Sequence, residues 1–250
     1  MPNPMSLEDK RVLITGASSG IGRACAIEAA SLGASVILTG RREDALQETL
    51  GMMECPSSHQ IITGDIGDSV FVKQLMDSCG KLDGLVHAAG VCPAIPVGVI
   101  DSAALVDSMR INYFAFMELM KCCSKKRYSN EHFSAVAVSS VSAEVGWSCG
   151  ALYSGSKGAI SAAIRSLALE LAPKGFRVNA VCPSNIKTPM FDSLAGEMND
   201  EAGLAALKAK QPLGIGSPEQ VAKPVCFLLS DAASFITGVN LPVDGGYLAQ

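Results

Sequence analysis

The stretch Thr15-Gly16-Ala17-Ser18-Ser19-Gly20-Ile21-Gly22 decides the fold of this chain. It follows a short apolar run at 11–15, and a segment with helical rhythm continues from it. A strand, a glycine-rich turn and a helix in direct succession are the setting of a phosphate-binding turn. Gly16 permits the tight turn, Gly20 lets the backbone approach a pyrophosphate, and Gly22 lets the helix pack on the strand. The stretch therefore predicts a dinucleotide site at a helix N-terminus, where the amides and the helix dipole attract an anion.

Short apolar runs alternate with longer helix-like segments along the rest of the chain. We expect strands at 11–15, 35–39, 60–63, 84–87, 134–139, 177–182 and 240–243. We expect helices at 21–32, 42–50, 70–79, 103–123, 153–171 and 218–229. This alternation predicts an α/β fold with one doubly wound parallel sheet and helices on both faces. The 250 residues are expected to form a single domain, 1–250, in which the irregular region 183–216 is a candidate substrate lid.

Composition argues against several classes of partner. The net charge is −4 and no basic tract is present, so we expect no nucleic acid partner. Glycines and prolines interrupt the longest uncharged stretch, 84–100, which is incompatible with a membrane span. Residues 1–10 lack the features of a secretory signal, which favours a cytoplasmic location. The nine cysteines contain no C-x-x-C pair and are expected to be free thiols, and the three histidines share no ligand spacing, so no metal is predicted.

The glycine spacing G-x-x-x-G-x-G resembles that of the short-chain dehydrogenase/reductase family, and further family motifs follow along essentially the whole chain. They are Asp65-Ile66, His87-Ala88-Ala89-Gly90, Asn112, Ser140, Tyr153-Ser-Gly-Ser-Lys157, Arg177-Val-Asn179, Pro183 to Thr188 and Asp244-Gly-Gly. The resemblance implies a Rossmann fold and an NAD(P)-dependent oxidoreductase that interconverts a carbonyl and a secondary alcohol by hydride transfer. The family's sugar-epimerase branch has a different glycine spacing and an added C-terminal domain, and is disfavoured here.

Tyr153 and Lys157 are the principal catalytic candidates. Their i, i+4 spacing places both side chains on one helix face. The spacing arises often by chance, so the family context decides the assignment. Carbonyl reduction needs a proton donor at the carbonyl oxygen, and we expect Tyr153 to be that general acid. A nearby ammonium and the positive charge of an oxidised nicotinamide are expected to lower the pKa of Tyr153 toward neutrality.

Ser140 is expected to complete the reaction centre by hydrogen bonding the substrate oxygen. Ser139 and Ser142 are rivals, but strand alternation turns Ser139 to the opposite face and indicates a structural role. The resemblance implies that Asn112 holds a water molecule linking Lys157 to solvent; a packing amide is the alternative.

The resemblance also implies a set of cofactor contacts. Asp65 would bind the adenine amine, and Ile186 and Thr188 would orient the carboxamide. The remaining implied contacts are Ser18, Ser19, Ile21, Ile66, Ala89 and Gly90. Three departures from the family pattern affect details: Ser184 replaces a glycine, His87-Ala88 replace paired asparagines, and an arginine expected near Pro212 is missing.

NADP(H) is expected to be preferred over NAD(H). Enzymes that select NAD place a carboxylate after the second strand, where it accepts hydrogen bonds from the ribose. Here Gly40 occupies that position and Arg41 follows, with a guanidinium suited to a 2′-phosphate. The alternative is that Arg41 and Arg42 only solvate the start of the next helix.

The substrate stays open between several classes. The overall pattern most resembles 3-oxoacyl-[acyl-carrier-protein] reductases, with sugar, polyol and other ketone reductases as alternatives, and a catalytically silent nucleotide-binding protein as a further one. Lys125-Lys126-Arg127 could meet an acidic carrier protein or could be a solvated helix end. The resemblance implies a homo-tetramer, and we place one interface on the small, apolar face formed by Ala159, Ala163 and Leu167.

Overall fold

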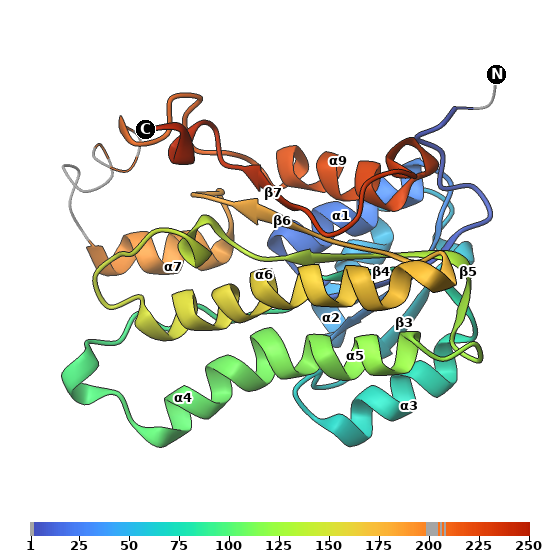
Figure 1. The fold of residues 1–250 in the computed structure, drawn as a ribbon, viewed down its shortest axis with the longest axis horizontal. Helices are drawn as coiled ribbons and strands as arrows, with labels where there is room; N and C mark the ends of the chain where they lie inside the picture. Colours follow the sequence, from blue (N-terminus) through green and yellow to red (C-terminus); the bar gives the residue numbers. More distant parts are fainter. Residues whose placement is uncertain (1–2, 199–204, 206, 208) are drawn as a thin grey trace.

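The computed structural model, which describes residues 3–198, 205, 207 and 209–250, contains one seven-stranded parallel sheet between two helical layers (Figure 1). The strands are β1 (Arg11–Thr15), β2 (Ser35–Gly40), β3 (Gln60–Thr63), β4 (Leu82–His87), β5 (Ser129–Val138), β6 (Arg177–Pro183) and β7 (Asn240–Val243). Their order in the sheet is β3-β2-β1-β4-β5-β6-β7. The predicted α/β class and the parallel sheet with helices on both faces are confirmed.

Alternation along the strands divides the core into two clusters. Val12 and Ile14 of β1 face the layer formed by α1 (Gly20–Ser31), α2 (Glu43–Gly51) and α9 (Pro218–Leu229). Between them, Leu13 faces the layer formed by α3 (Ser69–Cys79), α5 (Ala115–Cys123) and α6 (Ala151–Leu171). The five central strands, β2, β1, β4, β5 and β6, are therefore apolar on both faces, as a parallel sheet between two helical layers requires.

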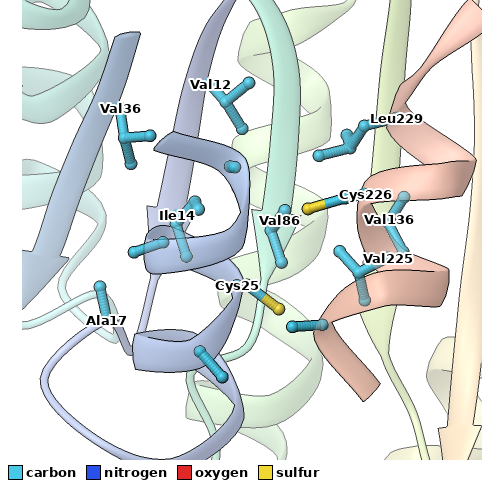
Figure 2. Close-up of a cluster of buried hydrophobic side chains, with 14 of the residues drawn as sticks. Val12, Ile14, Ala17, Cys25, Val36, Val86, Val136, Val225, Cys226 and Leu229 are labelled. Carbon is cyan, nitrogen blue, oxygen red and sulfur yellow. The ribbon is translucent and has the colours of Figure 1, made fainter. Parts of the chain in front are cut away.

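Small side chains let α1 and α9 pack closely together over the sheet. Cys25 of α1 and Cys226 of α9 point into the layer above Val12, Val86 and Val136 (Figure 2). Burial raises the pKa of the Cys25 thiol to about 12, so this sulfur stays protonated and behaves as a small apolar group. All nine cysteines are free, as predicted.

Three regions differ from the sequence-based expectation by more than two residues. The helix predicted at 103–123 is α4 (Ser102–Met109) followed by a π-helical segment (Arg110–Phe114) and then α5. The region expected to be irregular contains α7 (Pro189–Met198), which begins with a proline at a position that favours this residue. β5 begins at Ser129, five residues before the expected start, and pairs with β4 through a register shift.

Within the described residues, no helix is long and apolar enough to cross a membrane. The described part of the chain also has no cluster of three or more histidine, cysteine or carboxylate side chains that could hold a metal ion.

Candidate active site at the carboxyl edge of the sheet

The strand order creates a crevice at one edge of the sheet. β1 pairs with β2 on one side and with β4 on the other, so the connections that follow β1 and β4 diverge at their carboxyl ends. Ligands of doubly wound sheets bind at such a point. A cavity of about 910 Å³ lies there.

All but one of the predicted site residues line this cavity. They are Gly16, Ser18, Ser19, Gly20, Ile21, Gly22, Arg41, Asp65, Ile66, Ala89, Gly90, Ser140, Tyr153, Lys157, Ile186 and Thr188. The structure therefore brings together residues from every strand end between β1 and β6. Asn112 does not line the cavity and lies buried beneath it.

The glycine turn has the shape of a cradle for a dinucleotide. Gly16 has a φ of +68°, and a Cβ there would lie 2.7 Å from the amide nitrogen of Ala89. A Cβ on Gly22 would overlap the carbonyl oxygen of Gly16. Side chains at these positions would push the turn away from the loop after β4 and from the start of α1, whose N-terminal amides face the cavity. The turn therefore fits the pyrophosphate of a nicotinamide dinucleotide.

Tyr153 and Lys157 are placed side by side by α6. The Lys157 Nζ lies 5.6 Å from the centre of the Tyr153 ring and donates a hydrogen bond to the carbonyl oxygen of Val138 at 2.8 Å. Burial lowers the pKa of Lys157 to about 8. Burial also raises the pKa of Tyr153 above its usual value, and the neighbouring Ser140 hydroxyl opposes that rise.

Without the cofactor, the net shift of the Tyr153 pKa is upward, in contrast to the depression expected from Lys157 and an oxidised nicotinamide together. Desolvation of the phenol is the largest influence, and it raises the pKa. The neutral phenol is therefore the stable form within the protein. A positively charged nicotinamide is the remaining source of the depression that we expected.

The two neighbouring serines at the end of β5 have different partners. The Ser140 Oγ accepts a hydrogen bond from the Ser142 amide at 3.1 Å and lines the cavity. The Ser139 Oγ donates to the carbonyl oxygen of Lys157 at 3.0 Å and lies 2.8 Å from the Ser161 Oγ. Ser139 and Ser142 line the cavity as well, but the Ser139 hydroxyl contacts α6 and fastens it to the sheet, which agrees with the structural role expected for Ser139.

Asn112 lies in the π-helical segment, and its amide connects two parts of the site. Its Oδ1 accepts from the Val91 amide at 2.8 Å, while its Nδ2 donates to the Val91 carbonyl oxygen at 2.9 Å and to the Ser156 Oγ at 2.8 Å. The side chain therefore ties the loop after β4 to α6, between Tyr153 and Lys157.

His87 replaces the family asparagine at the end of β4 and is fully buried. Its Nε2 lies 3.2 Å from the Asn112 carbonyl oxygen, which can only accept, so Nε2 carries the proton. Its Nδ1 then accepts from the Thr15 Oγ1 at 3.1 Å, and that oxygen accepts from the Ala89 amide. Burial, assisted by the charge of Lys157, lowers the pKa of His87 to about 3 and keeps the ring neutral. The substitution therefore supplies a new link between β1, β4 and the π-helical segment.

Apart from Lys157, the charged residues among the described lining follow β2 and β3, on the side expected to receive the adenosine. The Asp65 carboxylate accepts from the Gly67 amide at 2.9 Å and pairs with Arg110 at 3.2 Å, and both contacts lower its pKa. Arg41 is exposed at the end of β2. A Cβ on Gly40 would lie 3.6 Å from the Ser18 Oγ, so the glycine turn and the end of β2 share one corner of the cavity.

Sequence reasoning missed the wall of the cavity next to Tyr153. Trp147 lies there, with its ring centre 6.5 Å from that of Tyr153, and Met190, Phe191 and Tyr247 line the same cavity. Trp147 is the single tryptophan of the chain and lies six positions before Tyr153, a signal that could have drawn attention to it.

Two polar side chains fix the loop after β6. The Ser184 Oγ donates to the Asp244 carbonyl oxygen at 2.9 Å, and the Gln211 Oε1 accepts from the Asn185 amide at 3.3 Å.

Comparison with known proteins agrees with this geometry. The family model described as Enoyl-(Acyl carrier protein) reductase matches residues 16–248. L-rhamnose 1-dehydrogenase (NAD(P)(+)) of Sphingomonas sp. (strain SKA58) is 35% identical, covering 96% of each chain. 3-oxoacyl-[acyl-carrier-protein] reductase of Rickettsia conorii is 36% identical, covering 98% of this chain and 99% of that one. A solved structure from Agrobacterium tumefaciens with bound NADP has a TM-score of 0.90 at 29% identity, covering 99% of this chain and 100% of that one. The chain therefore belongs to the short-chain dehydrogenase/reductase family of NAD(P)-dependent oxidoreductases.

Proposed function

We propose that this protein interconverts a carbonyl and a secondary alcohol with NADP(H), and that Tyr153 is the general acid and base. The observation that carries the proposal is the position of the Tyr153–Lys157 pair, which lines the same cavity as the glycine turn. A nicotinamide dinucleotide bound on that turn supplies the hydride. The protein's own residues then have to orient the carbonyl and supply one proton.

The raised pKa of Tyr153 suits this role in the direction of reduction. A phenol that stays protonated at neutral pH has a proton to deliver when negative charge develops on the carbonyl oxygen. The Ser140 hydroxyl lies at the end of β5 and can donate a second hydrogen bond to that oxygen. The Lys157 ammonium stabilises the phenolate that remains after the proton has left.

Asn112 and His87 are fully buried and support the reacting groups through hydrogen bonds. The Asn112 amide is engaged with Val91 and Ser156, so the water-holding role that the family resemblance implies would fall to its carbonyl oxygen. That oxygen has a second lone pair besides the one facing the His87 Nε2. We assign both residues a positioning role.

The cofactor preference is the second part of the proposal. Arg41 is exposed and lines the cavity, and no carboxylate follows β2 before the two arginines. The Ser18 hydroxyl and the Arg41 guanidinium can both donate hydrogen bonds to a 2′-phosphate at the corner they share. We therefore infer that NADP(H) is preferred over NAD(H).

The double substitution Gly40→Asp with Arg41→Ala tests this preference. A Cβ at Gly40 meets only ordinary contacts, so the carboxylate can be accommodated there. We expect the ratio of kcat/KM for NADPH to that for NADH to fall at least about tenfold, which corresponds to ~1.4 kcal/mol. An unchanged ratio would show that the phosphate is not read at this corner.

The basic segment Lys125-Lys126-Arg127 does not support docking of a carrier protein beside the cavity. It lies between α5 and β5, and the Leu82 amide at the start of β4 donates to the Tyr128 carbonyl oxygen at 2.9 Å. The segment is therefore at the amino edge of the sheet, where α5 connects to β5 (Figure 1), whereas the cavity lies at the carboxyl edge. Free ketones and carrier-linked ones remain to be separated by experiment.

A substrate panel tests the proposed reaction. Sugar ketones, simple cyclic ketones and 3-oxoacyl thioesters would each be mixed with enzyme and NADPH, and the absorbance of NADPH would be followed. We expect oxidation of NADPH with at least one ketone class, and the same protein with Tyr153→Phe serves as the control. Turnover that does not depend on Tyr153 would contradict the assignment.

A further inference from the structure

Trp147 presents an aromatic surface beside the proton donor. The ring centres of Trp147 and Tyr153 are 6.5 Å apart in an edge-to-face arrangement. The side chain lines the cavity and is 37% exposed, which is high for so large an apolar residue. A ligand whose carbonyl reaches Tyr153 therefore brings its neighbouring atoms against the indole.

A tight turn holds the indole in this position. The Gly150 amide donates to the Trp147 carbonyl oxygen at 3.2 Å, and Cys149 between them has a φ of +65°. The Ile95 amide donates to the Cys149 carbonyl oxygen at 2.9 Å and joins this turn to the loop after β4. The indole lies against Gly150, because a Cβ there would overlap the ring. Since α6 begins at the next residue, the wall and the catalytic helix form one unit.

The part of the cavity around Trp147 is apolar. Among the described residues that line the cavity, the charged ones are Arg41, Arg42, Asp65 and Lys157. The first three follow β2 and β3 on the adenosine side, and Lys157 lies beside Tyr153. Away from the glycine turn and the ends of β2 and β3, the apolar residues that line the cavity include Cys92, Ala94, Pro96, Val141, Val145, Met190, Phe191 and Leu194, and the neutral polar ones include Ser142, Ser148, Asn185 and Tyr247. A carboxylate or phosphate bound here would lose water without gaining a cationic partner from these groups.

We propose that the site selects uncharged ketones with an apolar body, and that Trp147 is the specificity-determining residue. The proposal rests on the proposed carbonyl reduction and names its substrate class. A ring or short alkyl chain next to the carbonyl packs on the indole, whereas a polyol hydroxyl placed against the indole would lose water there. Anionic sugar acids are excluded most strongly.

A matched pair of ketones tests the charge selection. 4-Oxocyclohexanecarboxylate and its methyl ester share one ring and differ in a negative charge at pH 7. We expect kcat/KM with NADPH to be at least about tenfold higher for the ester, since an unpaired carboxylate is costly to desolvate. An equal or higher kcat/KM for the carboxylate would overturn the proposal.

Binding without turnover separates this proposal from the proposed reaction. Trp147 is the chain's single tryptophan, so its fluorescence reports on this wall alone. In the Tyr153→Phe protein saturated with NADP⁺, the ester should change the emission in a saturable way at concentrations at least about tenfold lower than the carboxylate. Selective binding of the ester without reduction of either compound by the wild type would overturn only the proposed reaction. Tighter binding of the carboxylate would overturn only the substrate class.

Substitutions at Gly150 and at Trp147 itself test the role of the indole. Gly150→Ala should displace the ring, shift the emission and raise KM for the ester at least about tenfold, with a smaller change in kcat. Gly146→Ala is the matched control, because a Cβ there meets nothing within 4 Å, and it should leave KM unchanged. Trp147→Ala should raise KM likewise, and Trp147→Phe should restore most of the loss. An unchanged KM in Trp147→Ala protein of normal thermal stability would contradict the role of Trp147.

Discussion

At the residue scale, burial acts on the two central ionisable groups in the same sense, by favouring their neutral forms. It raises the pKa of the Tyr153 phenol and lowers the pKa of the Lys157 ammonium. The phenol therefore has a proton to give at neutral pH. The ammonium, in contrast, is close to losing its charge in the range where many enzymes are assayed.

The Lys157 pKa of about 8 predicts a pH dependence. Below this pKa the side chain carries the charge that stabilises the Tyr153 phenolate; above it the charge is lost. We expect kcat/KM for ketone reduction to be level below pH 8 and to fall up to about tenfold per pH unit above it. Initial rates between pH 6 and 10 measure this. In Lys157→Met protein the residual rate should lack the break near pH 8, and a wild-type rate that stays level to pH 10 would contradict the role of the ammonium.

At the element scale, the glycine turn joins β1 to α1 with almost no spare volume. Gly16 lies against the loop after β4, and Gly22 lies against Gly16. The turn therefore sets the distance between the start of α1 and the end of β4. The same contact that lets the helix pack also leaves its N-terminal amides open to a phosphate.

Gly22→Ala tests this arrangement. The added Cβ would overlap the Gly16 carbonyl oxygen, so the start of α1 must move away from the turn. We expect the Kd for NADPH to rise at least about tenfold, measured by titration of cofactor fluorescence. Gly51→Ala at the end of α2 is the control, because a Cβ there meets nothing within 4 Å, and it should keep the wild-type Kd. Equal Kd values for the two variants would show that the close contact at Gly22 does not matter for binding.

At the scale of the whole molecule, the sheet order places every reacting group at one edge, and α4, α5 and α6 lie along one side (Figure 1). On α6, Ala159, Ala163 and Leu167 are half-buried, and Leu169 is 80% exposed. Small side chains on a long helix allow a second helix to approach closely. We propose this face of α6 as one interface of the homo-tetramer that the family resemblance implies.

Light scattering at micromolar concentration measures the assembly. We expect a mass of about four times 25.9 kDa for the wild type. Ala163→Glu should lower that mass, because it places a charge in the proposed interface. A monomeric wild type would refute the proposal.

The sequence predicted those parts of the fold that local patterns determine. The glycine turn, the seven strands and the long helix carrying Tyr153 and Lys157 each depend on residues that are near one another in the chain. The π-helical segment around Asn112 could not be predicted, because it depends on hydrogen bonds to Val91 and Ser156 from distant segments. The Trp147 wall was missed for the same reason, since contacts with the loop after β4 hold it in place.

Tyr153→Phe tests the central claim most directly, namely that the Tyr153 hydroxyl supplies the proton in an NADP(H)-dependent carbonyl reduction. The ring keeps its packing against Lys157 and Trp147, but no proton can be delivered. We expect kcat for the best ketone of the panel to fall by about 10²- to 10⁴-fold while the Kd for NADPH changes less than about threefold. A variant that keeps its turnover, with NADPH bound as tightly as in the wild type, would contradict the account.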